Sequence, residues 1–320
     1  MRIPDIINAE LTNRCNLECV FCDHPQLKKV MRKGDMTVEL FETLLSGLGG
    51  QKIYELGLVG LGEPTLDKHL VPHLEVVKRY DGQFTRISLN SNGVALTSEK
   101  ARIILDSPVN LATFSLNATN RDAYIELMKA DKFDLAANNI REFIKIRNKF
   151  GRKDVKISVQ FMSSRLNAEK EMMELFSDYL DEDVIVYNRY VFHKPVLDTD
   201  NNKLLNINQV DMNIRYPCWS IYSRIYVDID GNIYPCTIGN DSYRADSSLV
   251  IGNLKEAGVL EIFNAPPVEH ARRNAERNHL PFNECKSCTL WQLLPNHFLF
   301  QEGRWLYNGE QGVRRPELDR

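Results

Sequence analysis

The 320-residue sequence lacks several features, and each absence excludes a class of protein. No apolar run approaches the roughly 18 residues that a membrane span needs. No secretory signal is visible, because a charge and a proline, Arg2 and Pro4, precede the first apolar segment. The formal net charge is only −3, which argues against a nucleic-acid groove as the dominant surface. We therefore expect a cytoplasmic protein that binds neither membranes nor nucleic acid.

Cysteine is scarce and unevenly distributed. Three of the seven cysteines lie near the N-terminus and four lie after residue 217, with none in between. An odd number leaves no complete disulfide scheme, and clustered thiols in a cytosolic chain are typical of metal ligands. Both groups are therefore interpreted as metal sites.

What the sequence does contain is a long alternation of strand and helix patterns, from residue 5 to about residue 195. Expected strands lie at residues 6–11, 53–59, 85–89, 111–116, 155–161 and 184–187. Expected helices lie at residues 37–48, 67–80, 134–150 and 168–180, with one more after Thr97, and Thr37 and Thr97 are the expected N-caps. Such alternation implies an α/β barrel or doubly wound sheet of parallel strands. A polar linker at 198–209 and a hairpin at 225–235 follow.

Three unusual loops fall at the carboxyl ends of expected strands. They are the loop with the first cysteines, a Gly-Leu-Gly-Glu-Pro turn at 60–64 and a Ser-Asn-Gly turn at 91–93. In folds with parallel strands the active site is built from the loops at this edge. The coincidence of the three loops predicts an active site there.

Cys15, Cys19 and Cys22 are spaced to bring three thiolates together on one loop. Three thiolates can hold three irons of a 4Fe–4S cluster and leave the fourth iron open to bind another molecule. A zinc site is the alternative, but zinc prefers a closed tetrahedron, and His24 is the only obvious fourth ligand. An open iron indicates chemistry rather than structural bracing.

The segment CNLECVFC at residues 15–22 resembles the signature loop of the radical S-adenosylmethionine (radical SAM) superfamily, in which an aromatic residue, here Phe21, precedes the third cysteine. The resemblance implies a partial (β/α)6 barrel, a 4Fe–4S cluster and bound S-adenosyl-L-methionine (SAM). It also implies that reduction of the cluster cleaves SAM to a 5′-deoxyadenosyl radical, which removes a hydrogen atom from the substrate. A reducing flavodoxin or ferredoxin is the implied protein partner.

The turn at 60–64 resembles the Gly-Gly-Glu-Pro turn of that superfamily, whose backbone and glutamate hold the methionyl amine of SAM. The resemblance assigns this role to Gly62 and Glu63, while Leu61 departs from the usual glycine.

Two further strand ends resemble SAM-contacting positions of the superfamily. Ser91 and Asn92 end the third strand, near the expected ribose or methionine carboxylate, and Ser115 and Asn117 end the fourth. Ordinary hydrogen bonding at a strand end is the alternative role for these four residues.

The second group of cysteines comprises Cys218, Cys236, Cys285 and Cys288. By spacing alone the group forms a closed four-thiolate site, which suits structural zinc or a complete cluster. The segments at 217–219, 227–236 and 252–254 resemble the SPASM module in its short "twitch" form, which implies one auxiliary 4Fe–4S cluster. Such a cluster can accept an electron or can merely stiffen a small domain.

We therefore expect a radical SAM barrel at residues 1–200, a small α+β twitch/SPASM-like cluster domain at 210–295 and a tail at 296–320. Resemblance to the 2-deoxy-scyllo-inosamine dehydrogenases and related twitch enzymes favours dehydrogenation of a sugar or aminocyclitol alcohol, with the auxiliary cluster accepting an electron. The reaction needs a base or cation beside the hydroxyl. The candidates are Arg165, Arg189, His193 and Asp211.

Three alternatives stay open. An epimerase of a sugar or peptide residue needs a hydrogen donor, and no cysteine is spare if both clusters take their full set; Cys218, Tyr190 or Tyr222 are the possible exceptions. A peptide maturase is the second alternative, and we expect no fused leader-binding domain because the first strand begins almost at once. The third is a non-enzymatic zinc-binding adaptor.

Overall fold

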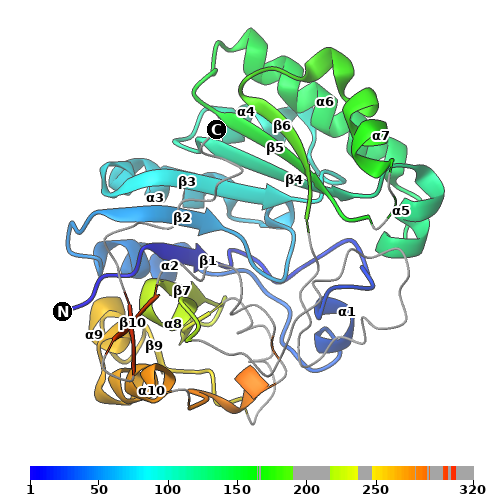
Figure 1. Ribbon diagram of the computed structural model, residues 1–320. Helices are drawn as coiled ribbons and strands as arrows, with labels where there is room; N and C mark the ends of the chain where they lie inside the picture. The colour runs from blue at the N-terminus through cyan, green and yellow to red at the C-terminus, as the bar shows by residue number, and fades with distance from the viewer. Residues whose placement is uncertain are drawn as a thin grey trace.

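The computed structural model describes residues 1–163, 165, 167–189, 217–236, 247–277, 279–286 and 288, together with the backbone of residues 298–301 and 304–307. Nine of the described strands form one sheet in the order β6-β5-β4-β3-β2-β1-β7-β8-β9 (Figure 1). Their bounds are β1 Ile6–Ala9, β2 Ile53–Leu58, β3 Phe84–Ser91, β4 Leu111–Asn117, β5 Lys156–Phe161, β6 Val184–Asn188, β7 Arg224–Val227, β8 Asn232–Tyr234 and β9 Gly252–Asn253.

The strands β1 to β6 are all parallel to their neighbours, and helices connect them. The helices are α1 His24–Leu27, α2 Val38–Ser46, α3 Leu70–Tyr80, α4 Ser98–Leu105, α5 Arg121–Met128, α6 Phe133–Lys149 and α7 Ala168–Leu175. The predicted α/β class and parallel sheet are confirmed. Thr37 and Thr97 cap α2 and α4 as predicted, because each hydroxyl accepts a hydrogen bond from the backbone N–H three residues later.

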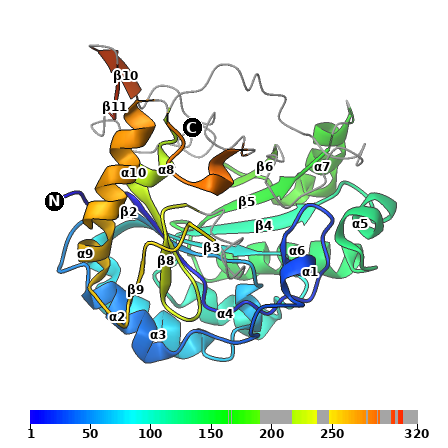
Figure 2. The same ribbon diagram turned by 90° about the horizontal axis from the view of Figure 1, so that it is seen from below.

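Helices cover one face of this sheet, and that face is apolar. Leu56, Ile87 and Val159 are buried there, and Phe114 packs edge-on against Phe143 of α6 with ring centroids 5.1 Å apart. Figure 2 shows α2, α3, α4 and α6 on the same side of the sheet. Burial of apolar side chains between these layers is the main source of stability for such a fold.

The opposite face carries polar side chains, because successive residues of a strand point to opposite sides. Ser115, Gln160 and Tyr187 are register partners on β4, β5 and β6. The Gln160 amide donates to the Ser115 hydroxyl, and the Tyr187 hydroxyl donates to the Gln160 side-chain oxygen at 2.8 Å. A hydrogen-bonded polar row therefore crosses three strands near their carboxyl ends.

The C-terminal region continues the same sheet. Strand β7 pairs in parallel with β1, so that Ile6 lies opposite Arg224, and β8 and β9 follow as antiparallel strands. The predicted hairpin is confirmed, and its turn depends on the buried Asp228, which accepts hydrogen bonds from the Asp230 and Asn232 N–H groups. Helices α8 Ser220–Ser223, α9 Val259–Phe263 and α10 Pro266–Glu276 flank this part, and β10 Phe298–Gln301 pairs with β11 Arg304–Tyr307 separately.

Several elements, among them α1, α9, α10 and the β10–β11 pair, were not expected from the sequence, and two further differences concern how segments pack. Helix α5 was not expected, and Asn120 caps it by accepting a hydrogen bond from the Ala123 N–H at 3.0 Å. The pairing of β7 with β1 was not expected either, since a sequence pattern does not specify which distant strands pair. The predicted linker at 198–209 lies outside the described residues.

Candidate active site

The loop with the first three cysteines follows β1 and is tied to two other elements. The Val20 N–H donates to the Leu127 carbonyl of α5 at 2.9 Å, and the Glu18 N–H donates to the Met128 carbonyl. On the other side, the Glu63 N–H donates to the Arg14 carbonyl at 2.7 Å. The backbone of the cysteine loop is therefore fixed between α5 and the turn after β2.

A second brace comes from the segment just before α2. The Asn13 side chain accepts from the Gly34 N–H at 2.9 Å, and the Thr12 hydroxyl donates to the Asp35 carboxylate at 2.7 Å. Arg14 pairs with the same carboxylate. Burial alone would raise the pKa of Asp35, but these hydrogen bonds outweigh it and hold the pKa below the usual value.

The three thiols lie half-buried and influence one another. Burial raises the pKa of Cys15 to about 12, and burial together with Cys22 and Cys15 raises the pKa of Cys19 well above its usual value. Metal binding to Cys15 and Cys19 therefore has to displace their protons. Among the described residues, no group of three or more His, Cys, Asp or Glu side chains is arranged around a single-ion site. Three thiolates on one loop can hold a cluster, because each thiolate binds a different iron.

The turn after β2 is packed directly against the cysteine loop. A Cβ atom on Gly62 would lie 2.1 Å from the Thr12 carbonyl oxygen, so only glycine allows this approach. Leu61, which departs from the superfamily pattern, is 4% exposed and packs with Leu27 and Met31. The leucine thus holds the segment after the third cysteine against the turn.

Glu63 joins this turn to the end of β3. Its carboxylate accepts from the Thr65 N–H and hydroxyl, from the Ser91 hydroxyl at 2.8 Å and from the Asn92 N–H at 2.6 Å. Burial raises the pKa of Glu63, although these hydrogen bonds act in the opposite direction. Four of the predicted cofactor residues, Gly62, Glu63, Ser91 and Asn92, are thus brought together. Three of these donors meet the Oε1 oxygen of Glu63, and the Asn92 N–H meets the Oε2 oxygen.

Asn92 extends the network back to the cysteines. Its side-chain amide donates to the Asn16 side-chain oxygen at 2.8 Å and lies 4.0 Å from the Cys15 sulfur. The cysteine loop, the 60–64 turn and the end of β3 therefore form one hydrogen-bonded unit.

Ser115 and Asn117 lie at the end of β4, as predicted. Asn117 adopts a left-handed backbone conformation, with φ of 61°, where the strand register shifts, and its amide donates to the Met128 sulfur. Asparagine tolerates this conformation better than most residues. Ser115 belongs to the polar row with Gln160 and Tyr187.

The four candidates for the substrate hydroxyl differ in their surroundings. Arg165 is exposed and pairs with both carboxylate oxygens of Glu171. Arg189 follows β6 and lies close enough to Cys19 to lower its pKa, against the larger effect of burial. His193 and Asp211 lie outside the described residues.

The four later cysteines come from three segments of the chain, because Cys285 and Cys288 lie three residues apart. Cys288 is buried in a small cluster with Tyr226, Tyr234 and Leu249, and Cys236 packs against the same cluster. Phe282 contacts this cluster and also a second one that contains Trp219, the neighbour of Cys218. The Cys285 N–H donates to the Phe282 carbonyl at 3.2 Å. Phe282 is thus the apolar link among the segments that carry the four thiols.

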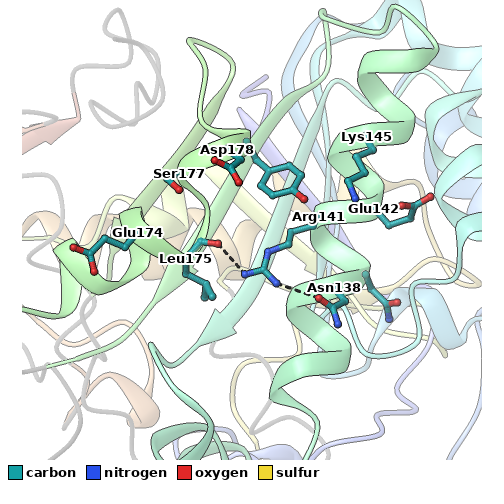
Figure 3. A pocket seen from close by; sticks show the side chains of 10 residues that line it. Asn138, Arg141, Glu142, Lys145, Glu174, Leu175, Ser177 and Asp178 are labelled. Carbon is teal, nitrogen blue, oxygen red and sulfur yellow. Dashed lines mark hydrogen bonds between the residues drawn. The ribbon is translucent and has the colours of Figure 1, made fainter.

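One open pocket lies elsewhere, between α6 and the region after α7 (Figure 3). It has a volume of about 770 Å³, and residues such as Arg141, Lys145, Glu174 and Asp178 line it. Arg141 is held there by the Leu175 carbonyl at 2.8 Å and by Asn138 at 3.1 Å. Because none of the predicted site residues lines this pocket, it is not the candidate active site.

The fold and the site define a class: an α/β protein with an iron–sulfur loop at the carboxyl edge of a parallel sheet. Comparison with known families agrees, since residues 9–157 match the Radical SAM superfamily and residues 218–289 match the SPASM iron–sulfur cluster-binding domain. Residues 9–157 therefore form a radical SAM domain, and residues 218–289 form a SPASM-type module. The first domain implies a 4Fe–4S cluster that binds SAM, and the second implies auxiliary iron–sulfur binding. The packed turn at Gly62 and the cysteine loop fit such a cofactor.

Curated relatives are distant. The tungsten-containing aldehyde ferredoxin oxidoreductase cofactor-modifying protein of Pyrococcus furiosus is 22% identical, over 88% of this chain and 86% of the relative. A GTP 3′,8-cyclase of Desulforamulus reducens is 27% identical over 44% of this chain and 42% of its own length.

Solved structures share the fold. BtrN, in complex with AdoMet and 2-DOIA, superposes with a TM-score of 0.57 at 17% identity and covers 90% of this chain and 94% of its own. SuiB of Streptococcus suis, bound to the precursor peptide SuiA, gives a TM-score of 0.63 at 15% identity over 91% of this chain and 71% of its own. No helix in the described ranges is both long and apolar enough to cross a membrane.

The sequence analysis did not predict two sets of contacts that hold the cysteine loop. It assigned no role to α5 or to residues 34–35. Two signals for α5 were present in the sequence: the capping residue Asn120, and the apolar residues Tyr124, Leu127 and Met128 at helical spacing. Asp35 offered no signal, because its partners Thr12 and Arg14 lie more than 20 residues away in the chain.

Proposed function

We propose that the protein is a radical SAM dehydrogenase that oxidises an alcohol carbon of a polar small molecule, of the sugar or aminocyclitol class, in the cytoplasm. When bound, the SAM-binding cluster and SAM supply a carbon radical that abstracts a hydrogen atom, and the auxiliary cluster supplies an acceptor for one electron. A carbinol that loses a hydrogen atom, an electron and the hydroxyl proton becomes a ketone. A flavodoxin or ferredoxin is the proposed reductant.

The observation that carries this proposal is the polar row Ser115–Gln160–Tyr187, which lies near the carboxyl ends of β4, β5 and β6. A substrate rich in hydroxyl groups needs hydrogen-bonding partners in a site that excludes water. An amide and two hydroxyls in a fixed row provide both donors and acceptors, and Ser115 is shared with the expected SAM contact.

The roles of the other residues follow from their contacts. Glu63 accepts hydrogen bonds from Ser91 and Asn92, so we propose that it positions these two residues, and that the peptide oxygens of the 60–62 turn accept from the methionyl amine. Arg189 is the described candidate whose charge reaches the cysteine loop, so we propose it as the cation beside the substrate hydroxyl. Arg165 is engaged by Glu171, which makes it the weaker candidate.

Relatives support the substrate class without fixing it. BtrN was solved with 2-DOIA and matches this chain along nearly the whole of both chains. The Pyrococcus furiosus relative is described as a cofactor-modifying protein, so a small cofactor precursor belongs among the substrates to be tried.

The proposal is tested by measuring the mass of the substrate before and after the reaction. Reduced enzyme is incubated in deuterated water with SAM and candidate aminocyclitols, sugars, cofactor precursors and peptides. A loss of two mass units, with release of 5′-deoxyadenosine, is the expected result. A gain of one unit on an otherwise unchanged substrate would instead show epimerisation, and would overturn the oxidative proposal.

Peptide modification is the second candidate, because SuiB was solved with its precursor peptide. The same assay separates it, since only a peptide would then change mass. Epimerisation by a returned hydrogen is less favoured, since all seven cysteines are assigned to clusters in this proposal.

A further inference from the structure

Tyr124 lies on the face of α5 that packs against the cysteine loop. It is fully buried, as are Leu127 and Met128, which follow it by three and four residues and so share its face of the helix. The carbonyls of Leu127 and Met128 accept the backbone hydrogen bonds from the cysteine loop. The phenol is therefore placed one helical turn from the point where α5 holds that loop.

The Tyr124 ring is fixed, but its hydroxyl has no partner among the described residues. The ring packs edge-on against Phe133, with centroids 5.8 Å apart. The hydroxyl oxygen is buried and makes no hydrogen bond in the described part of the chain. A buried polar group without a partner costs roughly 1–3 kcal/mol, and buried tyrosine hydroxyls usually find one.

The backbone contacts of α5 identify the missing partner. The Glu18 and Val20 N–H groups donate to the Met128 and Leu127 carbonyls, so Cys19, which lies between them in the chain, is the cysteine of the loop that is held against α5 from both sides. Glu63 already accepts four hydrogen bonds, and the Cys15 sulfur is approached by the Asn92 amide. Cys19 immediately precedes Val20, which α5 holds. A protonated thiol is a weak acceptor, whereas a metal-bound thiolate carries charge and accepts better.

We propose that the Tyr124 hydroxyl donates a hydrogen bond to the Cys19 thiolate once the loop holds its cluster, and thereby raises the reduction potential of that cluster. Hydrogen bonds to cluster sulfurs are among the factors that set such potentials. The donor stabilises the reduced cluster more, because reduction adds negative charge beside it. The inference rests on Cys15, Cys19 and Cys22 as the cluster ligands, and Tyr124 acts as a positioning and tuning residue.

The test is a redox titration of full-length, anaerobically reconstituted protein without SAM, followed by electron paramagnetic resonance. The relevant cluster is identified as the one whose signal changes when SAM is added afterwards. In Tyr124→Phe the potential falls, so that the ratio of reduced to oxidised cluster at a fixed potential drops roughly fivefold, the effect of one hydrogen bond. Iron content is expected to equal that of the wild type.

Two controls separate the hydrogen bond from packing. Phe133→Leu alters the ring contact but keeps the hydroxyl, and Tyr80→Phe removes a phenol at the end of α3; both are expected to leave the potential unchanged. If Tyr124→Phe fails to load iron, site-specific 3-fluorotyrosine at position 124, a stronger donor, is expected to raise the potential.

The outcomes are distinct. A titration that shows no SAM-responsive cluster in the wild type overturns the ligand assignment and the proposed function with it. A responsive cluster whose potential is the same in Tyr124→Phe and the wild type overturns only the role of Tyr124. A shift that occurs solely with SAM present also overturns it, because the partner would then be SAM.

Discussion

The two groups of cysteines occupy regions that are built in opposite ways. Cys15, Cys19 and Cys22 share one short loop, and α5, the 60–64 turn and residues 34–35 all hold that loop by hydrogen bonds. Cys218 and Cys288, by contrast, come from segments about seventy residues apart. Small apolar clusters around Phe282 connect those segments.

This difference indicates how each site depends on its metal. The N-terminal loop is held in place by hydrogen bonds from the protein itself, as a site that must expose one reactive iron requires. The C-terminal group gathers distant segments, so metal binding contributes a larger share of its folding free energy. The predictions below test that contrast, from the largest expected effect to the smallest.

Substituting Gly62→Ala should have the largest effect, because the new Cβ meets backbone atoms of Thr12, Asn13 and Arg14 that cannot move independently. We expect a loss of stability of about 3 kcal/mol or more. Iron and SAM should be lost from the N-terminal loop, while auxiliary iron is retained. The matched control is Gly82→Ala, where nothing lies within 4 Å of the added atom. Iron analysis and SAM binding measure both, and full iron in Gly62→Ala would refute the packing argument.

Removing iron with a chelator should loosen the C-terminal region far more than the barrel. Hydrogen exchange of β8, β9 and α10 is expected to rise by one or more orders of magnitude, whereas β2 to β5 keep their protection. Equal protection of both regions with and without metal would show that the apolar clusters alone hold the C-terminal segments.

Glu63→Gln should destabilise the site by roughly 1–3 kcal/mol, because its amide N–H₂ must then face the Asn92 N–H or the donors of Thr65 and Ser91. Weaker SAM binding is expected in parallel. Glu126→Gln on the exposed face of α5 is the control, and denaturant unfolding of both variants gives the comparison. An effect no larger than that of the control would mean that the four hydrogen bonds contribute little.

Substituting Asp35→Asn should have a small, pH-dependent effect on the stability of the protein. Its folded pKa lies below the usual value, so its contribution is present above the unfolded pKa near 4 and is lost as the pH falls through the folded value. Asp35→Asn should therefore reduce the stability of the metal-free protein at pH 7 by about 1 kcal/mol or less and flatten its pH dependence below pH 5. Parallel pH profiles for the two proteins would contradict this assignment.

The sequence was sufficient for features that depend on local pattern. The Thr37 and Thr97 caps, the hairpin around Asp228 and the parallel sheet all follow from residues close together in the chain. Helix α5 was not predicted, and its contacts with the cysteine loop, through the carbonyls of Leu127 and Met128, join residues more than 100 positions apart.

Non-local interactions could not be predicted in the same way. The motif resemblance placed Glu63 at the cofactor, but two of its four donors, the Ser91 hydroxyl and the Asn92 N–H, come from a strand end that only the folded sheet brings near. The pairing of β7 with β1 likewise joins residues more than 200 positions apart.

The most direct test of the two-site account is a metal count on anaerobically purified protein and two variants. The wild type should hold two four-iron clusters with negligible zinc. The triple variant Cys15→Ala/Cys19→Ala/Cys22→Ala should retain only the auxiliary cluster, and Cys285→Ala/Cys288→Ala only the SAM-responsive one. Stoichiometric zinc in the wild type, or undiminished iron in the triple variant, would contradict the account.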